Sequence, residues 1–199
     1  HNGSYDLCFM RCLPNIILMA PSDENECRQM LYTGFKLNQP SAVRYPRGTG
    51  PGVKVQKEMT QLPIGKAEIK RKGKDVAILA FGAMVQPCER VGEEINATVI
   101  NMRFVKPIDE ALIINICENH QLIITVEENV IQGGAGSAVN EVVAAYGIER
   151  AIVNHGLPDR LIQHGTRDDM LIDAGLNYKG ILDFVMAQIS EPEKKKRIN

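Results

Sequence analysis

Two arginines lie at the end of an expected strand, on either side of a proline. Residues 42–48 read Ala-Val-Arg-Tyr-Pro-Arg-Gly, so Arg44 and Arg47 flank Pro46 where an apolar run stops. A guanidinium just past the carboxyl end of a strand is well placed to bind a phosphate, because its planar fork matches two phosphate oxygens. A surface ion pair is the other use of such a side chain, and the pattern leaves both open.

A glycine-rich turn offers a second candidate for phosphate binding. Residues 133–137 read Gly-Gly-Ala-Gly-Ser and join an expected strand to an expected helix, where free backbone amides attract anions. A dinucleotide fingerprint would need a third glycine where the chain has Val139, and an acid where it has Asn154 and His155. The glycines of Gly133–Gly136 fit better as residues that let the turn pack tightly against a sheet or a neighbouring subunit.

Two carboxylates and four histidines complete the set of reactive side chains. Glu127 and Glu128 end a strand on the side where open α/β sheets bind ligands, but adjacent strand residues face opposite ways and form no acid/base pair. We expect one to be solvated and the other to accept a hydrogen bond from a nearby amide. The histidines show no triad order or metal-ligand spacing. His1, in a turn-like sequence, is expected to be exposed, which suits contact with a hydroxyl.

Alternating apolar strands and amphipathic helices must position these residues. The pattern predicts an α/β fold with a mostly parallel sheet and helices on both faces, preceded by a partial α/β domain. Residues 1–50 form the partial domain, the Pro- and Gly-rich residues 51–65 form a linker, and residues 66–199 form the second domain. Strands are expected over 16–20, 41–45, 67–70, 75–81, 97–102, 122–127 and 150–154. Helices are expected from Ser22 or Asp23 onward and over 85–95, 109–119, 137–146, 166–174 and 178–189.

Composition excludes several classes of protein. The chain has 199 residues and a formal net charge of −1, so it lacks the clustered cations that bind nucleic acid. No apolar run approaches a membrane-spanning length. Five scattered cysteines argue against a disulfide framework and favour a reducing compartment, so we expect a cytoplasmic protein. Cys8 and Cys12 are expected to be buried.

Several blocks together resemble the C-terminal part of the 1-deoxy-D-xylulose 5-phosphate synthase family. They are His-Asn-Gly-Ser-Tyr-Asp (1–6), Pro-Ser-Asp-Glu-Asn-Glu (21–26), Ser-Ala-Val-Arg-Tyr-Pro-Arg-Gly (41–48), Met-Arg-Phe-Val-Lys-Pro-Ile-Asp (102–109), Thr-Val-Glu-Glu-Asn (125–129) and Gly-Gly-Ala-Gly-Ser (133–137). The resemblance covers the chain up to its basic tail. Transketolases and 2-oxoacid dehydrogenase β subunits share the architecture with looser versions of these blocks. A non-catalytic dimerisation or nucleotide-binding module is the alternative outside the enzymes.

The resemblance implies a function and two site residues. Family members use thiamine diphosphate and Mg²⁺, decarboxylate pyruvate, join the two-carbon unit to glyceraldehyde 3-phosphate for isoprenoid synthesis, and work as homodimers. His1 matches a histidine that contacts substrate, although Asn2 stands where the family has Gln or His. Arg47 matches the arginine that binds the phosphate of glyceraldehyde 3-phosphate.

The resemblance also implies that part of the enzyme is missing. The sequence has no Gly-Asp-Gly loop for Mg²⁺ and diphosphate, and the glutamate that activates thiamine should lie upstream of His1. We therefore expect no cofactor ligand and no metal ligand in this chain. The interpretation is a C-terminal fragment of such a synthase, inactive by itself.

Overall fold

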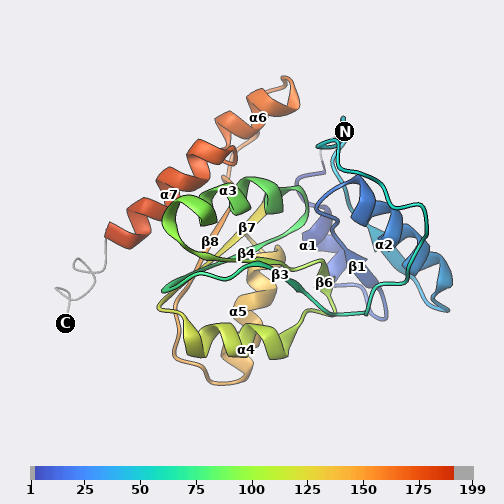
Figure 1. Ribbon diagram of the computed structural model, residues 1–199, viewed down its shortest axis with the longest axis horizontal. Coiled ribbons are helices and arrows are strands. Elements are labelled where there is room, and N and C mark those ends of the chain that lie inside the picture. The colour runs from blue at the N-terminus through green and yellow to red at the C-terminus, as the bar shows by residue number, and fades with distance from the viewer. Residues whose placement is uncertain (1–2, 191–199) are drawn as a thin grey trace.

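Two sheets of unequal size organise residues 3–190, the part of the chain that the computed structural model describes (Figure 1). The larger sheet has five strands in the order β3-β5-β4-β7-β8, and the smaller has three in the order β2-β1-β6. The predicted fold class, a mostly parallel α/β arrangement with helices on both faces and a partial α/β unit before it, is confirmed.

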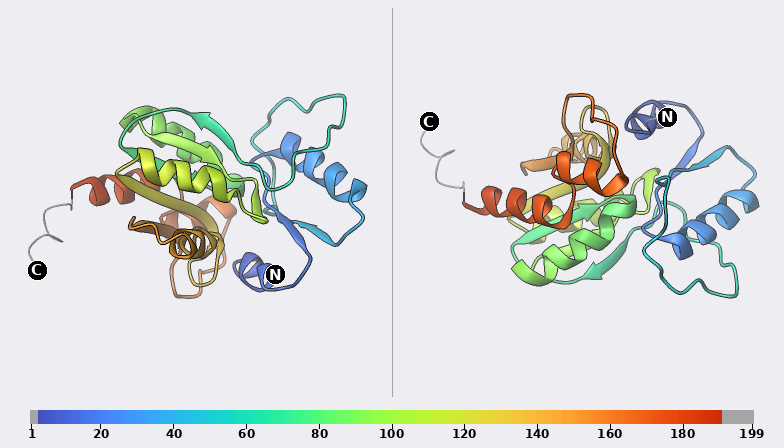
Figure 2. Two further views of the ribbon diagram at one scale, coloured as in Figure 1. Left: turned by 90° about the horizontal axis from the view of Figure 1, so that it is seen from below. Right: turned by 90° about the horizontal axis from the view of Figure 1, so that it is seen from above.

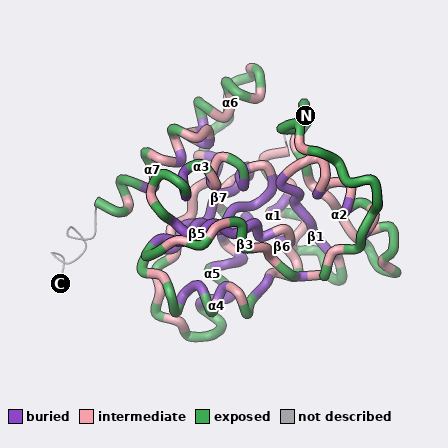
Figure 3. Tube along the Cα trace, in the orientation of Figure 1, coloured by how far each residue is buried: buried purple, intermediate pink, exposed green. Residues whose placement is uncertain are grey.

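The larger sheet is parallel except at one edge. Its parallel strands are β4 (Val76–Ala80), β5 (Thr98–Asn101), β7 (Leu122–Val130) and β8 (Ile152–Leu157), whereas β3 (Glu68–Arg71) runs antiparallel to β5. Every residue of β4 is buried, which matches its uninterrupted apolar sequence, because a central parallel strand has both faces covered. Figure 3 shows the buried strands as a continuous layer.

Helices cover both faces of this sheet (Figure 2). On one face α4 (Glu110–Asn119) and α5 (Ala135–Ala145) pack on side chains such as Leu79. On the other face α3 (Val85–Ile95), entered through the 3₁₀ turn η1 (Gly82–Met84), and α7 (Tyr178–Ser190) pack on side chains such as Ile78. Alternate residues of β4 therefore supply two separate cores. The short helix α6 (Arg167–Asp173) precedes α7.

The smaller sheet begins with a βαβ unit. Strands β1 (Ile17–Met19) and β2 (Ser41–Val43) pair in parallel around α2 (Glu24–Lys36), as the sequence predicts. Asp23 is the N-cap of α2, and its carboxylate accepts a hydrogen bond from Glu26 N at 2.8 Å. Two elements were not predicted: the helix α1 (Asp6–Arg11) and the strand β6 (Phe104–Lys106), which pairs antiparallel with β1.

A buried polar cluster joins the two sheets. The Glu26 carboxylate on α2 accepts hydrogen bonds from Asn101 Nδ2, at 2.9 Å to each oxygen, and from Arg103 Nε at 2.7 Å. Arg103 also donates to Glu68 on β3 at 2.7 Å. Glu26 and Asn101 are both buried, so the loss of either would leave hydrogen-bonding groups of the other without a partner. This cluster fixes α2 against the carboxyl end of β5.

The cysteines differ in part from expectation. No disulfide is present in the described part of the chain, but Cys12 is exposed and Cys8 only half-buried. The expectation that both are buried is wrong, because α1 lies on the surface and buries only Leu7 fully. Over residues 3–190, no helix has both the length and the apolar character needed to span a membrane.

Replacement of Glu26 should weaken the junction between the sheets. Glu26→Gln keeps the shape of the side chain but leaves Arg103 with Glu68 as its one remaining anion among the described residues, and it turns an amide group toward buried donors. We expect the free energy of unfolding to fall by about 3 kcal/mol in urea titrations. Glu118→Gln, on the exposed surface of α4, is the control and should change it by less than about 0.5 kcal/mol. Equal losses in the two variants would contradict a stabilising role for the cluster.

Candidate functional site

The two arginines of the segment 44–47 have different surroundings. Arg44 is largely buried; its Nη2 donates to the Gly3 carbonyl at 3.3 Å, and its Nη1 lies 3.9 Å from Glu128 Oε2. Arg47 is exposed in the turn after β2, and the structure gives its guanidinium no ion pair within the described part of the chain. The ion-pair interpretation therefore applies to Arg44, and the charge of Arg47 is available to an anion.

Glu128 at the end of β7 is not solvated, so that expectation is wrong. Its Oε2 accepts a hydrogen bond from Arg167 Nη2 at 2.8 Å, and only 15% of its side chain is exposed. Arg167 is the first residue of α6 and reaches back over the carboxyl end of the sheet. One carboxylate thus lies between two guanidinium groups from distant parts of the sequence.

Glu127 points to the opposite side of β7 and closes the glycine turn. Its two oxygens accept hydrogen bonds from Ala135 N at 2.7 Å and Gly136 N at 2.8 Å, at the start of α5. This confirms that one glutamate of the pair binds a nearby amide. The side chain is fully buried, and burial raises its pKa to about 7, although the two amides and the more distant Arg11 act in the other direction.

The amides of Ala135 and Gly136 are therefore already bound and are not available to a phosphate. A Cβ atom at Gly134 would lie 2.4 Å from Glu127 Oε2, and one at Gly136 would lie 2.4 Å from Thr125 Oγ1. Side chains at these two positions would displace the groups that hold the helix start. The glycines serve close packing of the turn against the sheet, which is the preferred interpretation of the motif.

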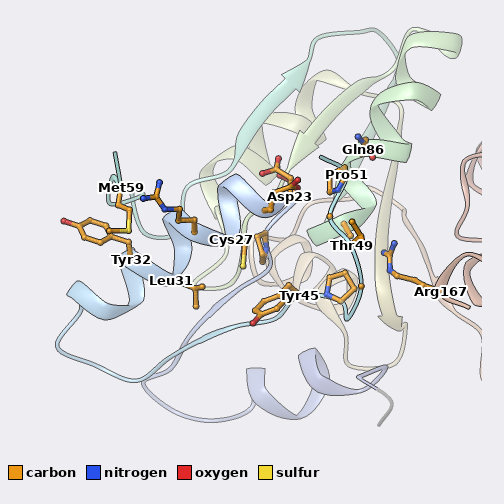
Figure 4. A pocket seen from close by; sticks show the side chains of 18 residues that line it. Asp23, Cys27, Leu31, Tyr32, Tyr45, Thr49, Pro51, Met59, Gln86 and Arg167 are labelled. Carbon is orange, nitrogen blue, oxygen red and sulfur yellow. The ribbon is translucent and has the colours of Figure 1, made fainter. Parts of the chain in front are cut away.

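A pocket of about 610 Å³ borders the turn that carries Arg47 (Figure 4). The size is typical of small-molecule sites. Its walls come from four regions: α2 and the residues just before it, the loop that follows β2, the corner where η1 leads into α3, and the start of α6. Among the lining residues are Asp23, Cys27, Leu31, Tyr45, Thr49, Gln86 and Arg167. Arg47 is not among them, so its side chain faces a different space from this pocket.

Two of the four histidines have structural contacts, and His164 is exposed. His1 lies outside the described residues; Gly3, two positions later, is held by Arg44. His120 contacts the Ile116 carbonyl through Nδ1 at 3.1 Å, as expected of a residue after a helix end. His155 contacts the Gly175 carbonyl and stacks on Phe184, and burial lowers its pKa.

Two features of residues 3–190 bear on the binding of a diphosphate and its metal ion. Within residues 3–190, no group of three or more His, Cys, Asp or Glu side chains could hold a metal. The one glycine-rich turn at a helix start is occupied by Glu127.

Comparison with known families agrees with this arrangement of two units. Residues 65–181 match the family described as the transketolase C-terminal domain, and residues 1–52 match the transketolase pyrimidine binding domain. The chain belongs to the transketolase family. The resemblance to the C-terminal part of 1-deoxy-D-xylulose 5-phosphate synthases is confirmed by similarity to individual members.

Two relatives of this transketolase-family chain are named 1-deoxy-D-xylulose-5-phosphate synthase. The protein from Nitrosococcus oceani is 57% identical over 196 residues, which are 98% of this chain and 31% of the relative. The protein from Nitrosomonas europaea is 52% identical over 190 residues, 96% of this chain and 31% of the relative. The chain thus spans less than a third of the length of these relatives.

Solved structures share the fold. A structure titled as a split-gene transketolase, inactive β4 tetramer, has a TM-score of 0.77 at 25% identity, and the match covers 92% of this chain and 60% of that one. The transketolase of Campylobacter jejuni has a TM-score of 0.62 at 16% identity, with coverage of 92% and 28%. At the lower identity the similarity supports the fold alone.

The residues that connect the two units carry no local signal in the sequence. Asn101 and Arg103 drew no attention because each finds its partner, Glu26, more than seventy positions away. The sequence places Arg167 in an expected helix and gives no further signal for it. The position of Arg44 at a strand end was the one available signal, and it indicated either a ligand contact or an ion pair.

Stability should depend on pH through Glu127. Its folded-state pKa of about 7 exceeds the ordinary value of 4.5, so its contribution to folding is complete at low pH and is lost as the pH rises through 7. The stability of the wild type relative to Glu127→Gln, which does not titrate, should fall by about 2.5 kcal/mol between about pH 5 and pH 8. Urea unfolding at several pH values measures this difference. Parallel stability curves for the two proteins would show that Glu127 keeps an ordinary pKa.

Proposed function

We propose that this chain is part of a thiamine-diphosphate-dependent transferase that forms 1-deoxy-D-xylulose 5-phosphate from pyruvate, with decarboxylation, and glyceraldehyde 3-phosphate, as an early step toward isoprenoids. The observation that carries the proposal is 52–57% identity, over nearly the whole chain, to proteins with this name. The similarity to structures named transketolase is much lower, at 25% and 16% identity. The synthase activity is therefore preferred to transketolase or dehydrogenase activity.

Arg47 is proposed to bind the phosphate of glyceraldehyde 3-phosphate. It is exposed, follows the carboxyl end of β2, and has no protein anion as a partner within residues 3–190. Pro46 restricts the backbone directly before it, which limits the directions in which the side chain can extend. A phosphate is the group that a free guanidinium in such a turn binds best, through two parallel hydrogen bonds.

His1 is proposed to contact the substrate on the same side of the molecule. Arg44 donates a hydrogen bond to the Gly3 carbonyl and precedes Arg47 by three residues. The chain segment that leads from His1 and the turn that carries Arg47 therefore meet at one guanidinium. An imidazole near a bound phosphate could donate a hydrogen bond to a substrate oxygen.

Thiamine diphosphate and Mg²⁺ are proposed to bind to residues outside the described part of this chain. Bound thiamine diphosphate supplies the electron sink that decarboxylation of pyruvate requires. We further propose that the chain by itself is inactive, that the intact enzyme is a cytoplasmic homodimer, and that residues 1–50, 51–65 and 66–199 are its pyrimidine-binding end, linker and C-terminal domain. Support comes from the coverage of the relatives and from the neighbour described as inactive.

Removal of the Arg47 side chain should weaken binding of the phosphorylated acceptor. In the full-length enzyme, Arg47→Ala should raise the KM for glyceraldehyde 3-phosphate and cost about 2 to 4 kcal/mol in kcat/KM, because a phosphate loses its guanidinium partner. The KM for pyruvate and the rate with unphosphorylated glyceraldehyde should stay near wild type. Lys54→Ala, in the exposed loop that follows, is the control. An unchanged KM for glyceraldehyde 3-phosphate would remove Arg47 from the site.

The isolated chain should show no synthase activity. Incubation of this polypeptide with pyruvate, glyceraldehyde 3-phosphate, thiamine diphosphate and Mg²⁺ should yield no product above the buffer blank, while the full-length enzyme at equal concentration turns over. Product formation by the isolated chain would contradict the proposal that the cofactor site lies elsewhere.

A further inference from the structure

Glu128 lies between two arginines that come from opposite ends of the chain. Its Oε2 accepts a hydrogen bond from Arg167 Nη2 at 2.8 Å and lies 3.9 Å from Arg44 Nη1. The exposed fractions of the Glu128 and Arg44 side chains are 15% and 13%, so water screens these contacts weakly. Through one carboxylate, β7 of the larger sheet is linked to the end of β2 and to the start of α6.

Arg44 extends this link to both segments expected to contact substrate. Its backbone N–H donates to the Met19 carbonyl at 2.9 Å, which continues the pairing of β2 with β1. Its Nη2 donates to the Gly3 carbonyl at 3.3 Å. Because Arg47 follows only three residues later, with Pro46 between them, displacement of Arg44 would move the turn that presents Arg47.

Arg167 supports the far end of the same turn. A Cβ atom at Gly48 would lie 3.9 Å from Arg167 Cδ, so the aliphatic part of Arg167 is next to the residue that follows Arg47. Figure 4 shows Arg167 extending from α6 toward the turn with Tyr45 and Thr49. Its Nε is buried and has no hydrogen-bond partner in the described part of the chain, so the contact with Glu128 is what fixes its charged end.

We propose that Glu128 is a positioning residue for the phosphate-binding turn. Acting through Arg44 and Arg167, its carboxylate holds residues 44–48 and the segment beginning at Gly3 in the geometry in which Arg47 meets the phosphate of the acceptor. Glu128 itself does not touch substrate. The inference rests on the proposed function, because it assigns Glu128 a role in acceptor binding.

A double-mutant cycle in the full-length enzyme tests this inference. Glu128→Gln keeps the size of the side chain but removes the charge that holds both arginines. We expect kcat/KM for glyceraldehyde 3-phosphate to fall by about 10- to 100-fold, mainly through KM, because a displaced guanidinium binds the phosphate poorly. With unphosphorylated glyceraldehyde the change should stay within about twofold. In the Arg47→Ala background, Glu128→Gln should add less than about a further twofold loss, since both changes act on the same contact.

Matched variants separate positioning from general damage to the fold. Asp173→Asn removes a carboxylate from the exposed ion pair with Arg160 and should leave both acceptors unaffected. Arg44→Lys keeps the charge but loses the fork, and should show a smaller loss than Glu128→Gln, again confined to the phosphorylated acceptor. If Glu128→Gln fails to fold, Arg167→Gln, which removes one of the two contacts, takes its place in the cycle.

The outcomes distinguish this inference from the proposed function. If Arg47→Ala leaves the phosphorylated acceptor unaffected, the proposed role of Arg47 fails and the inference falls with it. If Arg47→Ala has its effect but Glu128→Gln has none, only the inference is overturned. Equal losses with both acceptors, or losses that multiply in the double variant, would also overturn it, because they indicate a role independent of Arg47.

Discussion

Two carboxylates, Glu26 and Glu128, hold the smaller sheet against the larger one, and the position of the candidate site depends on them. Glu26 brings hydrogen-bond donors of Asn101, the last residue of β5, and of Arg103, two residues later, to the first turn of α2. Glu128 brings together Arg44 and Arg167. Removing a carboxylate from water is costly unless donors replace the lost hydration, so each carboxylate requires its partners in place. The contacts of Glu26 and Glu128 therefore restrict how the smaller sheet can lie relative to the larger one.

This restriction gives the three arginines near the turn different roles. Arg44 and Arg167 form ion pairs with Glu128, whereas Arg47 has no ion pair within residues 3–190 and its charge is available to a ligand. The five-residue turn 44–48 follows a strand and contains a proline, so it has little freedom once both of its ends are held. Ordering the turn then costs less free energy when a phosphate binds, and this is the general advantage of a preorganised site.

Strand β7, which carries Glu128, also carries Glu127, and this second carboxyl group has a separate role. Glu127 faces away from Glu128 and satisfies the amides at the start of α5, which keeps the glycine turn closed. Adjacent residues of one strand therefore serve two different neighbours, because successive side chains point to opposite faces. The sequence of the glycine turn resembles that of a phosphate site. Its amides at Ala135 and Gly136 instead bind the chain's own Glu127 carboxyl group.

Much of the fold could be predicted from local patterns, and much of the site could not. Apolar runs and helix caps such as Asp23 predicted most strands and helices, because these signals lie within a few residues of the element they define. The strand β6 has only three residues and pairs with β1 across some 85 positions, so no local pattern reveals it. The partners of Glu26 and Glu128 are equally remote in sequence. The motif around Arg47 was visible because its chemistry is contained in one short segment.

A crystal structure of the full-length enzyme with an acceptor-phosphate analogue bound would test the central claim most directly. The account predicts that the Arg47 guanidinium contacts the phosphate while Arg44 and Arg167 remain on Glu128. A phosphate bound away from Arg47, or an Arg44 that leaves Glu128 to bind the ligand itself, would contradict it.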